Sequence, residues 1–358
     1  MPRWIAKDTS RFSDEVYQDY SLQGVSRTFA LTIPQLPEKL RLQIGNAYLL
    51  CRTCDTIEDE PYLSIEQKEQ FAHNFIDVVK GNASANVFSD TLSAVLTEGT
   101  PEAERDLIRN AARVISLTHG FTPSQRNAIE RCVEEMATGM IHFQKRQSLN
   151  GLRDISELDD YCYYVAGVVG VMLTELYCDY SREIAMHREE MLKLSVSFGQ
   201  GLQMTNILKD IWEDRQRGAC WLPRDVFAHC AFDLTDLPAH RDDPCYLSGM
   251  GDLIGVARTH LRNALRYTLL IPAREKGIRR FCFWALWMAL LTLRKINKHR
   301  GFQSSQEVKI SHSSLKSVIV GTELVVSGHR RPHWLFDSLA KGLPEAPDGI
   351  GPDGIGTV

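Results

Sequence analysis

Two copies of one acidic pattern constrain this chain more than any other feature. The pattern is an Asp followed by Glu and Asp three and four residues later, and it reads DTIED at 55–59 and DIWED at 210–214. On a helix, each copy places its carboxylates on one face, which is then strongly negative. A single copy is typical of a solvated helix face. Two copies at the same spacing, each after an apolar run, indicate sites for hard divalent cations, which prefer oxygen ligands.

Apolar residues at helical spacing precede both copies and predict an all-α fold. They recur from 38 to 59, where Pro61 would end the helix, and from 189 to 214. The chain has no run of alternating strand residues, so we expect a single large helical domain around a central cavity. Further helices are expected at 14–20, 64–80, 89–96, 102–117, 124–147, 157–178, 252–270, 273–299 and 313–327.

The two ends of the chain differ from its body. Residues 1–20 are expected to form a polar lead-in, residues 21–341 the helical domain, and residues 342–358 a disordered tail rich in Gly, Pro and Asp. The tail contains a literal GxGxxG at 349–354. Because no strand precedes it and no helix can follow it, we interpret this match as chance.

Composition limits which partners the protein is expected to bind and in which compartment it is expected to occur. A net charge of -4 gives no basic surface, so we expect no nucleic-acid partner. The nine cysteines are odd in number and scattered, with no secretory signal before them, which predicts a reduced, cytoplasmic protein without a disulfide framework. Cys51 and Cys54 would serve helix packing. The most apolar window, 281–293, is shorter than the ~20 residues of a membrane helix, so we expect a buried helix and no transmembrane segment.

The acidic copies suggest a chemistry. Two such helices facing each other across an apolar cavity could hold Mg²⁺ ions that bridge a diphosphate. Arg52, Lys209 and Arg27, which has hydroxyls on both sides, would neutralise the remaining charge and stabilise a departing diphosphate. An Arg among hydroxyls is, taken alone, usually only surface. The carbocation left behind needs a dry pocket with aromatic faces; the candidates are Phe29, Tyr48, Tyr161 and Tyr164.

Small residues lie between the two copies. Ala166, Gly167 and Gly170 fall on neighbouring turns of the predicted helix at 157–178. They would permit close approach of a ligand or of another helix. Tight helix packing alone explains them at least as well.

Four motifs in this order resemble the squalene and phytoene synthases, the head-to-head isoprenoid synthases. They are SRTFA at 26–30, DTIED at 55–59, YCYYVAGVVG at 161–170 and NILKDIWED at 206–214, and the resemblance runs over residues 21–324. It implies the all-α isoprenoid synthase fold, a magnesium cluster and two prenyl diphosphate substrates. The metal ligands that it implies are Asp55, Glu58, Asp59, Asp210, Glu213 and Asp214.

The resemblance also implies roles for other residues. Tyr161 matches a tyrosine that the family implicates in proton removal and cation stabilisation. The diphosphate would be held by Ser26, Arg27 and Arg52, and Gln203 and Asn206 match polar pocket residues.

Two positions depart from the family pattern. Lys209 stands where the family usually has Arg, which keeps the charge but loses the bidentate fork. Ala219 stands where an Arg is common, and Arg215 or Arg217 could take its place. The membrane anchor of the eukaryotic enzymes is also not present, which suggests a soluble bacterial enzyme. We therefore expect a cytoplasmic monomer that meets farnesyl diphosphate during transient contact with the membrane surface.

The expected activity is that of a squalene synthase. It would condense two farnesyl diphosphates to presqualene diphosphate and reduce this intermediate with NADPH. Val308-Lys309-Ile310 resembles a segment associated with NADPH in these enzymes, so Lys309 would bind cofactor phosphates with Arg52, Asn206 and Lys209 nearby; a surface lysine is the rival interpretation. The alternative activities are a dehydrosqualene or phytoene synthase without reduction and, from another class, a non-catalytic scaffold.

Overall fold

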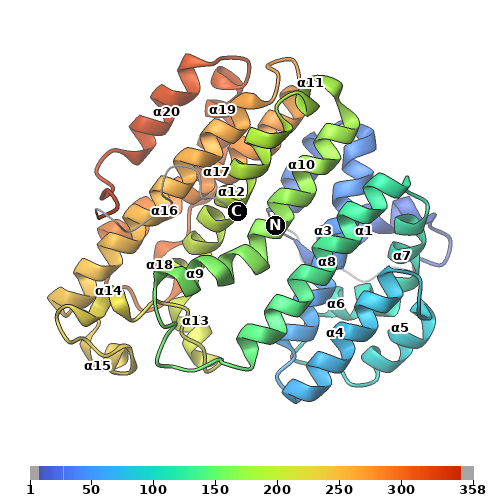
Figure 1. Ribbon diagram of the computed structural model, residues 1–358, viewed down its shortest axis with the longest axis horizontal. Coiled ribbons are helices and arrows are strands. Elements are labelled where there is room, and N and C mark those ends of the chain that lie inside the picture. The colour runs from blue at the N-terminus through green and yellow to red at the C-terminus, as the bar shows by residue number, and fades with distance from the viewer. Residues whose placement is uncertain (1–7, 27, 348–358) are drawn as a thin grey trace. The chain divides into compact units, whose positions relative to one another are not determined.

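The chain is all-α, as predicted. The computed structural model describes residues 8–26 and 28–347 (Figure 1). These ranges contain no strand, and a single isolated bridge joins Leu152 to Pro223. The contacts divide the chain into two compact units: unit 1 is Met1–Lys145 with Met172–Ala185, and unit 2 is Arg146–Val171 with Met186–Val358. The single domain expected at 21–341 stays a prediction.

Unit 1 is built around helix α3 (Glu38–Asp59), which contacts α1, α4, α6, α7 and α8. Its buried face carries Leu40, Ile44, Ala47 and Cys54, the apolar series seen in the sequence. The helices of this unit are α1 (Asp14–Val25), α2 (Phe29–Thr32), the 3₁₀ turn η1 (Ile33–Gln35), α4 (Ile65–Val79), α5 (Ala85–Ser93), α6 (Glu102–Arg109), α7 (Ala111–His119), α8 (Pro123–Gln144), most of α10 (Val168–Tyr180) and α11 (Arg182–Ala185).

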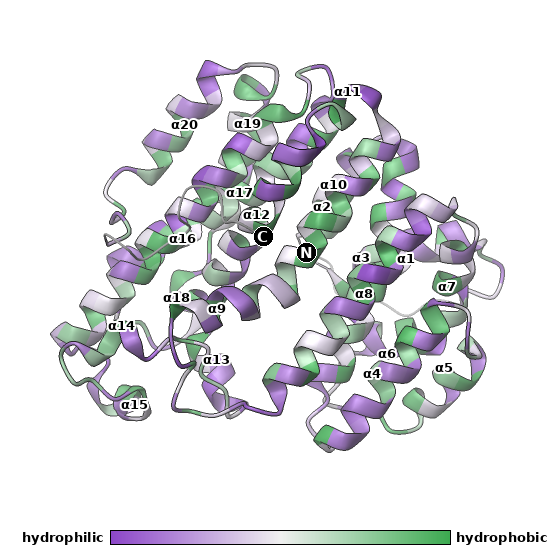
Figure 2. Cartoon of the chain, viewed as in Figure 1, coloured by the Kyte–Doolittle hydropathy of each residue, from purple (hydrophilic) through white to green (hydrophobic). Residues whose placement is uncertain are grey.

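Unit 2 is built around helix α12 (Arg188–Lys209), which contacts α9, α16, α17 and the π-helical turn η2. Figure 2 shows polar and apolar residues alternating along its helices, as amphipathic packing requires. The elements of this unit are α9 (Ile155–Cys162), η2 (Tyr163–Gly167), α13 (Ile211–Gln216), α14 (Asp225–Ala228), the 3₁₀ turn η3 (Leu234–Asp236), α15 (Leu237–His240), α16 (Pro244–Leu270), α17 (Lys276–Lys298), α18 (Ser305–Val308), α19 (His312–Val325) and α20 (Arg330–Ala340).

The small residues between the two acidic copies serve helix packing. A Cβ at Gly170 would collide with the carbonyl of Ser195, and one at Gly199 would collide with the carbonyl of Ala166. The backbones of η2 and α12 therefore touch directly, which only glycine permits. Of the two interpretations left open by the sequence, close helix approach is the one observed.

Helix continuity was the weakest prediction. The helix expected at 102–117 breaks at Asn110, and the one expected at 189–214 breaks at Asp210. Helix α5 begins at Ala85, capped by Ser84, where a turn was expected. Helix α20 was missed entirely.

The N-terminal helix agrees with expectation, whereas the C-terminal end differs. The helix expected at 14–20 is α1, which begins at Asp14, continues to Val25 and buries Tyr17, whose hydroxyl donates to Asp106. The prediction of disorder from residue 342 onward is wrong for 342–347, because Leu343 is buried and Arg258 donates to the carbonyls of Leu343 and Pro344. The GxGxxG match at 349–354 lies outside the described residues.

One prediction from composition needs correction, and another stays a prediction. Cys230 and Cys245 form a disulfide, although no disulfide was expected; an odd, scattered set of cysteines says nothing about which pairs meet in space. The window at 281–293 is buried in α17 as predicted, but the stretch Ile155–Tyr180 is long and apolar enough to cross a bilayer. That test rests on length and composition alone, and core helices also pass it.

Candidate active site

The acidic copy of unit 1 occupies the last turns of α3. Asp55 is half-buried, Glu58 is half-buried and Asp59, the final residue of the helix, is exposed. The helix ends here because the next residue, Glu60, turns its buried carboxylate to Thr97 and Thr100, which donate to it at 3.0 and 2.6 Å. The copy therefore stands at a helix end that a separate buried carboxylate holds in place.

A chain of contacts leads from this copy to the SRTFA segment within unit 1. Arg52 Nη1 lies 3.3 Å from Asp55 Oδ2, and Arg52 Nη2 donates to the Tyr48 hydroxyl at 3.3 Å. The Tyr48 ring packs against Phe29, with centroids 5.1 Å apart, and Ser26 Oγ accepts from the Phe29 amide at 2.9 Å. The structure thus brings together these five predicted site residues. Arg27, the sixth residue predicted for this group, lies outside the described residues.

Charge in this cluster is set by burial and by close neighbours. Burial raises the pKa of Asp55 to about 6, Arg52 opposes the rise, and Asp59 and Glu104 add to it. Burial disfavours the charge on Arg52, but Asp55, Tyr48 and Glu104 outweigh it and raise the pKa of the guanidinium. Arg52 Nε has no hydrogen-bond partner among the described residues, so one donor is left for a ligand.

Glu104 of α6 was missed in the sequence. Its carboxylate accepts from the Thr56 hydroxyl at 3.0 Å, and its charge acts on both Asp55 and Arg52. It lies in the segment PEAERD, in which the spacing of the charged residues matches no motif. Only the packing of α6 on α3 reveals it.

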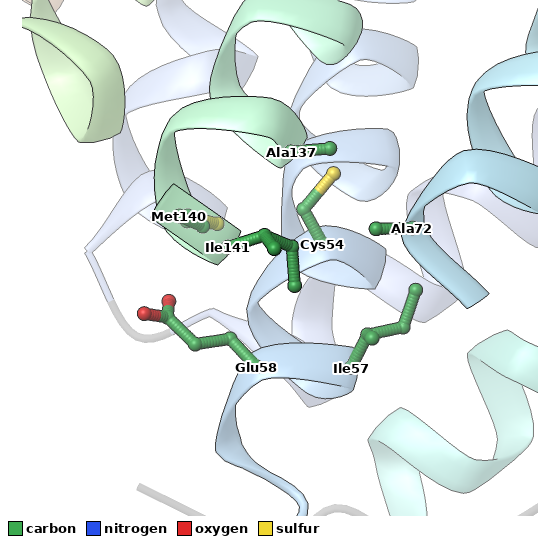
Figure 3. Close-up of a pocket in the computed structure, with 7 residues that line it drawn as sticks. All are labelled: Cys54, Ile57, Glu58, Ala72, Ala137, Met140 and Ile141. Carbon is green, nitrogen blue, oxygen red and sulfur yellow. The ribbon is translucent and has the colours of Figure 1, made fainter. Parts of the chain in front are cut away.

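Glu58 borders a small hollow between α3, α4 and α8 (Figure 3). The other lining residues are Cys54, Ile57, Ala72, Ala137, Met140 and Ile141. Figure 3 shows the carboxylate of Glu58 turned away from Ile57 and Ala72, toward the edge of the hollow. The backbone carbonyl of Glu58 accepts from Gln144 at 3.0 Å and also from Lys68. These two bonds fix the last turn of the helix.

The acidic copy of unit 2 spans a helix junction. Helix α12 ends at Lys209, Asp210 leaves the helical conformation, and α13 begins at Ile211. Lys209 Nζ lies 3.1 Å from Asp210 Oδ2 and donates to Asn206 Oδ1 at 3.3 Å. Burial raises the pKa of Asp210, while Lys209 and Arg217 oppose the rise. Gln203, three residues before Asn206 on α12, shares this helix face.

The two carboxylate oxygens of Glu213 have different surroundings. Its Oε1 accepts from the amide of Ser305 at 3.1 Å and from the Ser305 hydroxyl, which fixes the start of α18. Burial disfavours its charge, but the bonds from Ser305 outweigh that effect and lower the pKa of Glu213. Its Oε2 is buried and has no hydrogen-bond partner among the described residues. An orphaned carboxylate oxygen of this kind fits a metal ligand.

The same contact brings the predicted cofactor segment to the acidic copy. Val308 is the buried last residue of α18, and Lys309 follows it with an exposed side chain. Ser305, four residues before Lys309, is the partner of Glu213. Lys309 therefore belongs to a segment that is held at the second acidic copy within unit 2.

The two candidates for the missing arginine at Ala219 differ. The guanidinium of Arg215 donates to the carbonyls of Leu234 and Thr235, at 2.9 and 3.3 Å. Arg217 instead acts electrostatically on Asp210. Asp214, the last carboxylate of the copy, accepts through its carbonyl from the amide of Arg217 at 3.0 Å. The charge of Arg217 therefore acts on the acidic copy.

Tyr161 is buried at the end of α9. Its ring stacks on Trp221, with centroids 4.2 Å apart and planes 13° apart. Trp221 was not identified from the sequence, because an isolated aromatic in a loop carries no spacing signal. Tyr164 contacts Tyr163 edge to face at 5.3 Å. The candidate pocket residues of unit 2 thus include a fixed aromatic pair.

Comparison with known proteins identifies the family. Residues 22–314 match the family described as squalene/phytoene synthase. The squalene synthase of Eremothecium gossypii is 29% identical over 312 residues, which cover 86% of this chain and 68% of that protein. The squalene synthase clz20 of Cochliobolus lunatus is 31% identical over 293 residues, covering 80% of this chain and 67% of that protein.

A solved structure of TcSQS with the ligand BPH1237 has a TM-score of 0.74 at 22% identity, and the match covers 91% of this chain and 90% of that one. This likeness shows the isoprenoid synthase fold. The sequence matches extend over most of the chain and include both acidic copies. The chain therefore belongs to the squalene/phytoene synthase family.

Proposed function

We propose that this chain is a squalene synthase that condenses two farnesyl diphosphates head to head to presqualene diphosphate and reduces that intermediate to squalene with NADPH. The observation that carries the proposal is the likeness to two fungal squalene synthases over at least 80% of this chain. Family membership alone gives the coarser activity, a synthase of the squalene/phytoene type.

Magnesium is proposed as the metal, held by the carboxylates of the two acidic copies. The donor set fits, because each copy offers three carboxylates and Glu213 has an orphaned oxygen. When bound, the metal neutralises the diphosphate and makes it a better leaving group. Arg52, with its unpartnered Nε, and Lys209 then bind diphosphate oxygens and offset the charge that develops as the carbon–oxygen bond breaks.

Tyr161 is proposed to act on the cation. Its stack on Trp221 fixes the ring, so an aromatic face is available without loss of side-chain entropy during the reaction. The hydroxyl is the group proposed to handle the proton in the first condensation. Phe29 and Tyr48, which pack on each other in unit 1, are proposed as further aromatic contacts for the isoprenoid chain.

NADPH is proposed to bind with its phosphates at Lys309, and Arg52, Lys209 and Asn206 are proposed to contribute to the same site. The contact of Ser305 with Glu213 supports this, because it holds the segment before Lys309 at the second acidic copy. Hydride delivery next to the site of ionisation would let reduction compete with attack by water.

The product experiment tests the proposal. The protein is incubated with farnesyl diphosphate and Mg²⁺, with and without NADPH, and the hydrocarbons are identified by mass spectrometry. Squalene only in the presence of NADPH is the expected result. Dehydrosqualene or phytoene in both tubes would replace the reductive activity by the alternative one. A protein that releases no diphosphate in either tube would be the non-catalytic scaffold.

Transient contact of a cytoplasmic monomer with the membrane surface completes the proposal. Exposed apolar side chains on α19 and α20 support it: Val320 is 63% exposed, Leu324 67% and Trp334 71%. Arg331 of α20 donates to the carbonyl of Leu324 at 3.4 Å, and its charge would favour anionic lipid. Sedimentation with anionic vesicles should show about tenfold weaker binding for Trp334→Ala. The matched control is Tyr62→Ala, an exposed aromatic of unit 1.

A further inference from the structure

Cys230 differs from every other cysteine of the chain in exposure. Cys230 is exposed in the turn after α14, and Cys245 is half-buried in the first turn of α16, with their Cα atoms 6.1 Å apart. The remaining seven cysteines are not disulfide-bonded, and each is buried or half-buried. Exchange with a small thiol or disulfide requires access to sulfur. Cys230 is therefore the cysteine best placed for it.

The surroundings of the two sulfurs assign them different roles. His229 Nε2 lies 3.5 Å from Cys230 Sγ, so the imidazole can accept a proton from the Cys230 thiol once the pair is reduced. The carbonyl oxygen of Phe227 lies near both sulfurs, 3.6 Å from Cys245 Sγ and 4.0 Å from Cys230 Sγ, so the imidazole and the exposure of Cys230 are what distinguish the two. An exposed thiol beside a base and a shielded thiol within reach form an attacking and resolving pair.

The backbone next to Cys230 is held in an unfavourable conformation. Ala231 has φ 55°, and it is the one described residue other than glycine with a positive φ. An L-residue with a Cβ is destabilised there, so surrounding contacts must maintain it. The amides of Ala231 and Phe232 donate to the carbonyls of Ala228 and Phe227, at 3.0 and 3.3 Å, and these bonds hold the turn that carries Cys230.

The loop closed by the disulfide contacts Arg215, the residue after the second acidic copy. Residues 231–244 include Leu234 and Thr235, whose carbonyls accept from the guanidinium of Arg215. Arg215 directly follows Asp214. The redox state of the pair thus bears on the segment that carries the acidic copy.

We propose that Cys230 and Cys245 form a reversible thiol–disulfide site that exchanges with low-molecular-weight disulfides such as glutathione disulfide. In the oxidising direction, His229 takes the proton of Cys230, and the thiolate attacks glutathione disulfide and releases one glutathione. The Cys245 thiol then loses its proton and attacks Cys230 Sγ, and the second glutathione leaves. Two protein thiols are oxidised and one glutathione disulfide is reduced to two thiols. This proposal does not depend on the proposed synthase activity.

Tryptic digestion separates the two cysteines cleanly. Cys230 falls in the peptide 225–241 and Cys245 in the peptide 242–258, because Arg224, Arg241 and Arg258 are the cleavage sites. The full-length protein is equilibrated with glutathione and glutathione disulfide at a series of ratios, alkylated and digested without reductant. Mass spectrometry should show the two peptides linked at oxidising ratios and separate at reducing ratios. A link that persists at every ratio, or never forms, would overturn the proposal.

Serine variants test the order of attack. In Cys245→Ser, a glutathione adduct should accumulate on the peptide 225–241, because the resolving thiol is gone. In Cys230→Ser, the peptide 242–258 should stay largely unmodified. Equal adducts in both variants would refute the assigned roles. The half-buried Cys51 and Cys178 are internal controls, and equal modification of their peptides would show that Cys230 has no special reactivity.

Two further measurements test the role of His229 and the binding of a metal. His229→Gln should slow adduct formation in the Cys245→Ser background about tenfold near neutral pH, because the thiol loses its base; an unchanged rate would refute the role of His229. The reduced trio His229, Cys230 and Cys245 also has the composition of a soft-metal site. Stoichiometric Zn²⁺ binding that blocks exchange with glutathione disulfide would make this a metal site and overturn the proposal.

Discussion

Substitutions of Glu213 separate the two tasks that this side chain performs. In Glu213→Gln, the amide oxygen can still accept from the amide and hydroxyl of Ser305, but a nitrogen replaces the orphaned Oε2. In Glu213→Ala, both the anchor of α18 and the candidate metal ligand are lost. The pair of variants therefore distinguishes loss of a ligand from loss of a structural contact.

The contacts of Glu213 determine how much each substitution should lower the stability and the rate of diphosphate release. Each hydrogen bond to a charged acceptor contributes about 1.5–3 kcal/mol, and Glu213 is only partly buried, so the lower end applies. Glu213→Ala should then cost about 3 kcal/mol, which lowers Tm by roughly 4 °C in a chain of this length, whereas Glu213→Gln should cost about 1 kcal/mol. Both should lower diphosphate release about 100-fold, because each lacks a carboxylate ligand.

Thermal unfolding and a Mg²⁺ titration of diphosphate release measure the two effects separately. Ser305→Ala is the matched control, because it removes one donor to Oε1 and leaves Oε2 unchanged. It should lower Tm by a few degrees and leave turnover within about threefold of wild type. Wild-type turnover in Glu213→Gln would refute the role as a ligand. Equal stability of the Gln and Ala variants would refute the role as an anchor.

Three more substitutions probe other parts of the molecule. Asp55→Ala should lower turnover at least about 100-fold while the circular dichroism spectrum stays helical, because a ligand is lost from an already crowded acidic face. Tyr161→Phe should keep the stack on Trp221 but slow formation of presqualene diphosphate about tenfold or more, measured in the absence of NADPH. Glu60→Gln should lower stability at pH 7 by about 2 kcal/mol. Burial disfavours the charge of Glu60, but hydrogen bonds from Thr100 and Thr97 outweigh it and hold the pKa below its usual 4.5. The contribution of Glu60 is therefore full above that value and disappears as pH falls through the lowered pKa. Melting curves of wild type and Glu60→Gln should differ at pH 7 and converge in acid.

The helices that carry the acidic copies could be predicted because their signal is local. Apolar spacing located α3 to its last residue, and Pro61 together with Glu60 explains its end. The break at Asp210 could not be predicted in this way. It accompanies contacts of Trp212 with Phe302 and of Glu213 with Ser305, 90 and 92 positions later in the chain.

The residues missed at the site share one property. Glu104 and Trp221 belong to no motif, and each reaches its partner through packing between segments far apart in sequence. The disulfide was missed for the same reason, since counting cysteines reveals nothing of two Cα atoms 6.1 Å apart. The family resemblance supplied roles for residues, whereas the surroundings that tune those residues appear only in the structure.

The junction at Asp210 makes the two acidic copies mechanically unequal. In unit 1, all three carboxylates belong to α3 and keep the spacing of one rigid helix. In unit 2, Asp210 follows α12, which packs along α16, whereas Glu213 and Asp214 belong to α13, which Phe302 and Ser305 hold. Backbone bonds from the amide of Asp210 to the carbonyl of Asn206, at 2.8 Å, and from the amide of Asp214 to the carbonyl of Asp210, at 2.9 Å, join the two helices at this point. The carboxylates of unit 2 are thus positioned by two helices with different packing partners, whereas a single helix positions those of unit 1.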